Sequence, residues 1–136
     1  MATTIDKNKL KGAEEAEIRS LKNFLTHCPT YTTPLGCIIP VKGSYTPGGY
    51  IRFSRTMRFQ DRTTRHVRMY WHVLIYCLNH PHEELSHLDV SHICHTASCG
   101  NIKHLCLEDR LTNNQRKVCN SSGSCTGHDG HPDCIF

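Results

Sequence analysis

The sequence contains few of the apolar residues that build a protein core. Its 136 residues include one tryptophan, and the hydrophobic share of 38% is reached only by counting nine cysteines. Globular domains usually contain about 45–50% apolar residues, so we expect a thin core that needs another source of stability. No run approaches the roughly 18 consecutive apolar residues of a transmembrane helix, so we expect no membrane-bound protein.

A secretion signal is also absent. The first residues, MATTIDKNKLKGAEEAE, contain no apolar stretch and no cleavage signature. An odd number of cysteines fits poorly with a closed set of disulfides, which argues against a disulfide-rich extracellular protein. We therefore expect an intracellular, nuclear protein with reduced thiols.

The cysteines and histidines concentrate near the C-terminus. Residues 91–134 hold six of the nine cysteines and five of the eleven histidines. The first group is Cys94-x4-Cys99-x4-His104, which offers three of the four ligands of a tetrahedral zinc site. An upstream cysteine, Cys28 or Cys37, could supply the fourth.

A second group can complete a zinc site by itself. It consists of Cys119, Cys125, His128 and Cys134, with His131 as a rival to His128. We favour His128 because Cys-Thr-Gly-His places a glycine at the turn between two ligands. Cysteine thiolates with one histidine are typical ligands of structural zinc.

Six arginines and a single acid, Asp61, lie between residues 51 and 70. The arginines are Arg52, Arg55, Arg58, Arg62, Arg65 and Arg68. Such a basic stripe is typical of proteins that bind a polyanion. Their spacing would suit one face of a helix, but the glycines and aromatics around them favour a hairpin or meander.

Three helices and a strand are expected elsewhere. Apolar residues at helical spacing predict an amphipathic helix over residues 11–26, and the apolar stretch 71–81 predicts a short buried helix ended by Pro81. Leu107, Leu111 and Val118 predict a third helix over 107–118 with an apolar face. A loosely alternating strand over 85–90 leads to His92.

The C-terminal pattern resembles the His-Cys box of His-Me finger homing endonucleases. The residues that fall on the family pattern are Ser91, His92, Cys94, Cys99, His104, Asn113 and Cys119, and Leu105-Cys106 also has a counterpart. The end departs from it, because Cys125-x2-His128-x5-Cys134 replaces a tighter spacing. The resemblance implies an α+β, zinc-stabilised ββα-metal fold with a small antiparallel sheet and short helices.

The resemblance also implies the roles of individual residues. Zinc site 1 would consist of Cys37, Cys94, Cys99 and His104, and zinc site 2 of Cys119, Cys125, His128 and Cys134. Cys37 is preferred to Cys28 because the family takes this ligand from a cysteine before a short apolar-proline stretch. His92 would be the general base and Asn113 the Mg²⁺ ligand, with Asn114 the less well spaced neighbour. Arg58, or else Arg52 or Arg65, would bind the scissile phosphate.

We therefore expect a single domain over 1–136, with an N-terminal helix in 1–30, a sheet and DNA-binding region in 31–90 and the His-Cys box in 91–136. The expected activity is Mg²⁺-dependent hydrolysis of double-stranded DNA, leaving a 5′-phosphate and a 3′-hydroxyl. The alternative is a catalytically silent, zinc-stabilised DNA-binding or regulatory protein. The family's C-terminal arm beyond the second zinc site has no counterpart after Phe136, so we expect a monomer or weak homodimer that pairs on DNA.

Overall fold

A computed structural model describes residues 9–85 and 87–136. The first half contains α1 (Glu15–His27), β1 (Thr30–Thr32), β2 (Ile38–Pro40), β3 (Ser44–Tyr45), β4 (Ile51–Arg58) and β5 (Thr64–Tyr70). The second half contains α2 (Trp71–Asn79), β6 (Asp89–His92), a 3-10 turn η1 (Ile102–His104), β7 (Leu105–Glu108) and α3 (Arg110–Ser122). Helices and small antiparallel sheets in one chain confirm the α+β class.

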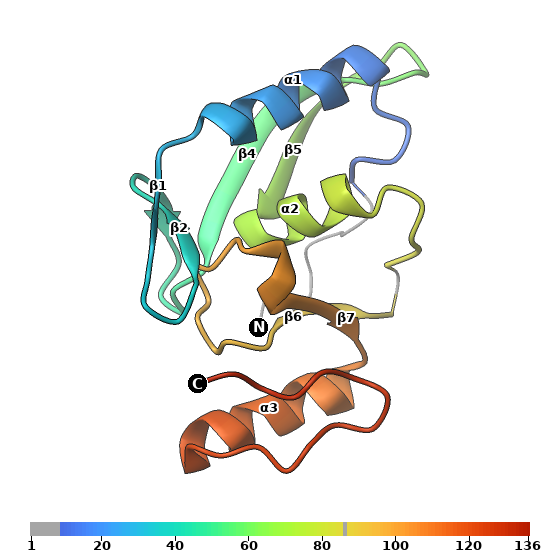
Figure 1. Cartoon of the computed structure of the whole chain (residues 1–136). Helices are drawn as coiled ribbons and strands as arrows, with labels where there is room; N and C mark the ends of the chain where they lie inside the picture. The colour runs from blue at the N-terminus through green and yellow to red at the C-terminus, as the bar shows by residue number, and fades with distance from the viewer. Residues whose placement is uncertain (1–8, 86) are drawn as a thin grey trace.

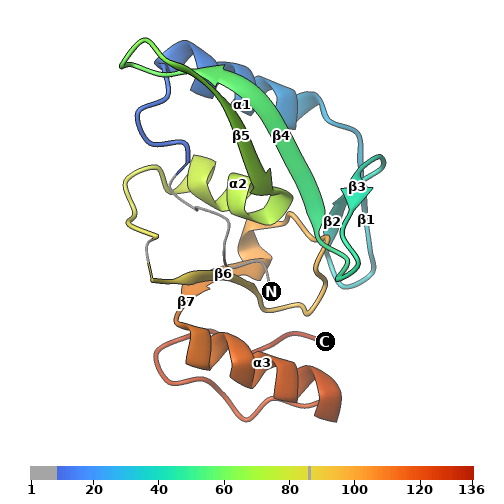
Figure 2. The same cartoon turned by 180° about the vertical axis from the view of Figure 1, so that it is seen from behind.

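The upper part of the molecule is built on the sheet β3-β4-β5. Figures 1 and 2 show α1 lying along β4 and β5, with α2 below them. Buried and exposed residues alternate along β4, and the buried ones include Ile51, Phe53 and Met57. The arginine-rich segment is therefore a hairpin, and the helical alternative is excluded.

The core of this part comprises Leu21 of α1, Phe59 after β4, and Trp71 and Leu74 of α2. Leu21 and Leu74 are completely buried. Within the described chain, no helix combines the length and apolar character needed to cross a membrane.

The lower part of the molecule consists of the antiparallel pair β6-β7 and α3, with the C-terminal segment running beside α3 (Figure 1). α3 packs against β6. Strand, strand and helix here follow the ββα order that the His-Cys box resemblance implies.

The third helix does not bury the apolar residues that predicted it. α3 begins at Arg110 and extends to Ser122, and its apolar residues Leu111 and Val118 are each 69% exposed. Its buried residues are Thr112, Arg116 and Cys119. The reason is that α3 packs through a cysteine cluster and a buried ion pair rather than through an apolar stripe.

Two further boundaries differ from the expected ones. α1 begins at Glu15 instead of residue 11, because residues 9–12 form a turn in which Gly12 has a φ of +80°. The strand before the His-Cys box is β6, which includes His92 and begins only at Asp89. The helix predicted over 71–81 is present as α2, which stops before Pro81.

Candidate metal and nuclease site

The first cluster brings together Cys37, Cys94, Cys99 and His104, whose ligand atoms all lie within 4.8 Å of one another. His104 Nδ1 is 3.7 Å from Cys37 Sγ and 3.5 Å from Cys99 Sγ. Zinc bonds of about 2.3 Å to sulfur and 2.0 Å to nitrogen place tetrahedral ligands about 3.6 Å apart. The cluster therefore fits zinc.

Three segments of the chain deliver these four ligands. Cys37 precedes β2, Cys94 and Cys99 follow β6, and His104 ends η1. The Asn101 amide donates to the carbonyl of Gly36 at 2.8 Å, which ties the loop of Cys37 to that of His104. Cys28, the rejected candidate, packs instead against the apolar core.

Hydrogen bonds prepare the first cluster for metal binding. The Asn101 backbone N–H donates to Cys99 Sγ at 3.4 Å. A hydrogen bond from the Cys94 thiol, followed by this backbone contact, lowers the pKa of Cys99, while the same hydrogen bond raises the pKa of Cys94. The thiolate, which is the form that binds zinc, is therefore favoured at neutral pH.

The second cluster brings together Cys119 at the end of α3 with Cys125, His128 and Cys134 of the following segment. His128 Nε2 is 3.6 Å from Cys119 Sγ and 3.4 Å from Cys134 Sγ. These separations again match a tetrahedral zinc site. His131 lies outside this cluster, so the structure places His128 rather than His131 with the three cysteines.

Groups around the second cluster orient its ligands. Gln115 of α3 contacts His128 Nδ1 through its amide oxygen at 3.3 Å, which leaves Nε2 for a metal. The Gly127 backbone N–H donates to Cys125 Sγ at 3.4 Å, and Gly127 has a φ of +99°. Backbone N–H groups of Cys134 and Gly127 lower the pKa of the Cys125 thiol.

His92 is the last residue of β6 and lies against the first cluster. Its Nε2 is 3.0 Å from the carbonyl oxygen of Cys99. Since a carbonyl only accepts, Nε2 carries the hydrogen and the basic lone pair is on Nδ1. Burial lowers the pKa of His92 to about 4, so the ring is neutral at pH 7. The loop that carries Cys99 thus holds His92 with its basic lone pair on Nδ1.

Asn113 is positioned on α3 by Asp89 of β6. The Asn113 Nδ2 donates to Asp89 Oδ2 at 3.1 Å, so the amide oxygen is available to other ligands. Asp89 is itself held by Arg110, whose Nε lies 2.6 Å from the same carboxylate oxygen. This contact sets the rotation of the Asn113 amide relative to the strand that ends in His92.

His92 and Asn113 line one cavity of ≈ 260 Å³ between β6 and α3. The remaining wall is largely polar and includes Tyr50, His95, Lys117 and Asn120. A neutral histidine, an amide oxygen and a lysine facing one cavity are suited to binding a phosphate and activating water. Asn114, the rival of Asn113, is exposed and does not line this cavity.

A family model describing the zinc-binding loop region of homing endonuclease matches residues 36–133. This match covers more than half of the chain and includes seven of the eight cysteine and histidine residues of the two clusters, all but Cys134. The chain belongs to this family. Comparison with curated protein sequences gives no match.

The structure separates the arginines that the resemblance offered for phosphate binding. Arg52 is the second residue of β4 and lies opposite Tyr70, whose ring stacks on that of Tyr50 in the cavity wall with 5.0 Å between the centroids. Arg58 ends the same strand, and six residues of strand correspond to about 20 Å. Arg65 lies near that far end, stacked over Phe59 and paired with Asp61. Of the three, Arg52 lies at the end of the hairpin next to Tyr70, and its Nη1 donates to the carbonyl of Tyr45 at 2.7 Å.

Several residues of this family member's site carry no recognisable signal in the sequence. His72 of α2 is buried, with its ring centroid 4.3 Å from that of His92. Burial and the neighbouring His92 keep the pKa of His72 well below its usual value. Asp89 and Tyr50 also contribute through contacts between segments distant in sequence, which no local spacing reveals. Lys117 could have been found, because it lies one helical turn after Asn113.

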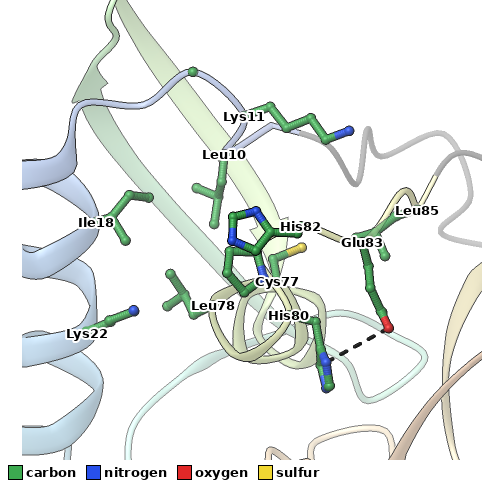
Figure 3. A pocket seen from close by; sticks show the side chains of 12 residues that line it. Leu10, Lys11, Ile18, Lys22, Cys77, Leu78, His80, His82, Glu83 and Leu85 are labelled. Atoms are coloured by element: carbon green, nitrogen blue, oxygen red, sulfur yellow. Dashed lines mark ion pairs between the residues drawn. The ribbon is translucent and has the colours of Figure 1, made fainter.

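A separate cavity of ≈ 430 Å³ lies between α1, α2 and the segments beside them (Figure 3). Its apolar wall includes Leu10, Ile18 and Leu78, and an ion pair joins His80 to Glu83 at 3.9 Å. None of its lining residues belongs to either zinc-type cluster or to the His92 cavity. The nuclease chemistry of the family therefore has its candidate residues in the smaller cavity.

Proposed function

We propose that the protein is a Mg²⁺-dependent endonuclease that hydrolyses phosphodiester bonds of double-stranded DNA. The observation that carries this proposal is the shared cavity of His92 and Asn113, which come from β6 and α3 next to the two clusters. Membership of the homing endonuclease family supports the reaction class. The basic hairpin supports a polyanionic substrate.

The position and the hydrogen bond of His92 suit a general base. Its Nε2–H donates to Cys99, so the ring cannot rotate freely and Nδ1 is left to take a proton from water. A positioned base contributes typically about 10²–10⁴-fold to the rate of proton transfer. The ring of His72 packs against the ring of His92 and limits its movement.

Asn113 is the residue that would hold Mg²⁺. A bound magnesium ion would neutralise charge that develops on the phosphate and on the leaving oxygen. Asn113 offers a single neutral oxygen, so DNA phosphate oxygens and water must supply the remaining ligands. Asp89 fixes the amide so that the oxygen, and not the NH₂ group, faces away from the carboxylate.

The exposed face of the hairpin is the proposed DNA-binding surface. Arg52, Arg58 and Arg68 are exposed, and they alternate with buried residues along β4 and β5. Long basic side chains on a two-stranded ribbon can enter the major groove. We propose Arg52 as the arginine nearest the scissile phosphate, since Arg58 and Arg65 lie at the other end of the hairpin.

The test is incubation of zinc-loaded protein with supercoiled plasmid and MgCl₂. We expect nicked circles first, because a monomer or weak dimer cuts one strand per encounter, and at least about 10²-fold slower nicking by His92→Ala. Asn113→Ala should be equally impaired, whereas the exposed neighbour variant Asn114→Ala should cut normally. Zinc-loaded wild-type protein that binds DNA but never nicks it would favour the silent, regulatory alternative.

A further inference from the structure

A third group of potential metal ligands lies beside the second cluster. It consists of Cys106 and Glu108 on β7 and His131 in the C-terminal segment, with ligand atoms within 4.8 Å of one another. His131 Nδ1 is 3.9 Å from Cys106 Sγ and 3.9 Å from Glu108 Oε1. The histidine nitrogen therefore faces a sulfur and a carboxylate oxygen at the same distance.

A tight turn separates the two histidines of this segment. His128 and His131 form an isolated β-bridge, and the backbone N–H of His131 donates to the carbonyl of His128 at 2.9 Å. Gly130 between them has a φ of +74°, which a glycine adopts readily. One end of the turn thus provides a ligand for the second cluster, and the other end directs His131 to Cys106 and Glu108.

We propose that Cys106, Glu108 and His131 form a third metal site, which takes a divalent ion of the zinc class. One thiolate, one imidazole and one carboxylate are ligands that zinc accepts together. Three protein ligands leave the fourth position to water or another small ligand. The His131 side chain is 26% exposed, so solvent can reach this position.

The geometry makes this site weaker than the two clusters with four ligands. Tetrahedral zinc places sulfur and nitrogen ligands about 3.6 Å apart, so the 3.9 Å separation of Cys106 and His131 must shorten by a few tenths of an ångström. Glu108 also accepts from Arg116 at 2.7 and 2.8 Å. A carboxylate oxygen has a further lone pair for a metal. The hydrogen bonds from Arg116 would then fix the orientation of the Glu108 carboxylate.

The test is a titration of protein that holds two zinc ions per chain with Co²⁺, whose visible bands report tetrahedral coordination. Zinc released into solution is measured at the same time, so that exchange at the first two clusters is recognised. We expect one Co²⁺ per chain to bind without zinc release, with a charge-transfer band from a single thiolate. Wild-type protein that binds no Co²⁺ under these conditions would overturn the proposal.

Variants identify the ligands. Cys106→Ser and His131→Asn should each weaken Co²⁺ binding by at least about tenfold while two zinc ions remain. Cys28→Ser and His82→Asn change a cysteine and a histidine outside all three groups and should bind Co²⁺ as the wild type does. Unchanged binding in both ligand variants would refute the site. Since no DNA cleavage is measured, the result is independent of the nuclease proposal.

Discussion

The two ends of the molecule are held together by different forces. Around β4, β5 and α2 the interior is apolar, with Phe59, Met69 and Leu74 almost fully buried. Around α3 the buried residues are Thr112, Arg116 and Cys119. The first region resembles an ordinary hydrophobic core, whereas the second depends on a metal-type cluster and an ion pair.

This difference bears on the proposed nuclease site, which lies where the two regions meet. His92 is on β6 beside the first cluster. Asn113 is on α3, whose buried residues are polar or belong to the second cluster. Apolar packing alone would position the histidine better than the asparagine. We therefore expect the second cluster to hold α3, and with it Asn113, in place.

The largest expected effect comes from Cys119→Ser, which removes a ligand from the second cluster. Structural zinc contributes about 10–16 kcal/mol of binding free energy in zinc-finger peptides, and binding is coupled to folding. We expect the variant to lose one zinc per chain and much of the helical signal of α3, measured by metal analysis and circular dichroism. Cys28→Ser is the matched control and should retain both ions. A native spectrum with two zinc ions in Cys119→Ser would contradict the account.

The next largest effect is expected for the buried ion pair of Glu108 and Arg116. Glu108→Ala leaves the buried Arg116 without its carboxylate, which typically costs about 3–5 kcal/mol of the free energy of unfolding. Denaturant unfolding measures this loss. Glu15→Ala breaks the exposed pair with Arg19 and should leave the stability unchanged. Equal effects of the two variants would show that burial of the pair has no special role.

The two regions differ in how much of their structure could be predicted from the sequence. Cys94, Cys99 and His104 are close in sequence, so their spacing predicted a common site, whereas Cys37 required the family resemblance. The contact between Asp89 and Asn113 depends on how α3 packs on β6, and no local pattern encodes it. The face of α3 was wrongly predicted because apolar spacing assumes an apolar interior, and here Leu111 and Val118 face solvent.

Two leucines test the same contrast with a smaller change. Leu74 in the apolar core is completely buried, and Leu74→Ala should cost about 2–5 kcal/mol of the free energy of unfolding. Leu111→Ala on α3 should change it by no more than about 0.5 kcal/mol, because this side chain is 69% exposed. Denaturant unfolding of zinc-loaded variants distinguishes the two. A large loss in Leu111→Ala would mean that α3 does pack through its apolar residues.

The smallest effect is expected for Gln115, which contacts the zinc-ligand candidate His128. Gln115→Ala removes the amide oxygen that contacts His128 Nδ1, so zinc affinity of the second cluster should fall about tenfold. Competition with a chromophoric chelator measures this affinity. Asn114→Ala, at the preceding exposed position of α3, should leave the affinity unchanged. If both variants bind zinc as the wild type does, Gln115 does not orient the ligand.

Hydrogen exchange of zinc-loaded and chelator-treated protein tests the central claim most directly, since it reports each helix and strand separately. Amides in the interior of a stable element exchange slowly, and those of an unfolded one exchange at once. We predict that chelation removes protection throughout α3 (Arg110–Ser122) while β4 and β5 retain more of theirs. Full protection of α3 after loss of both zinc ions would contradict the account.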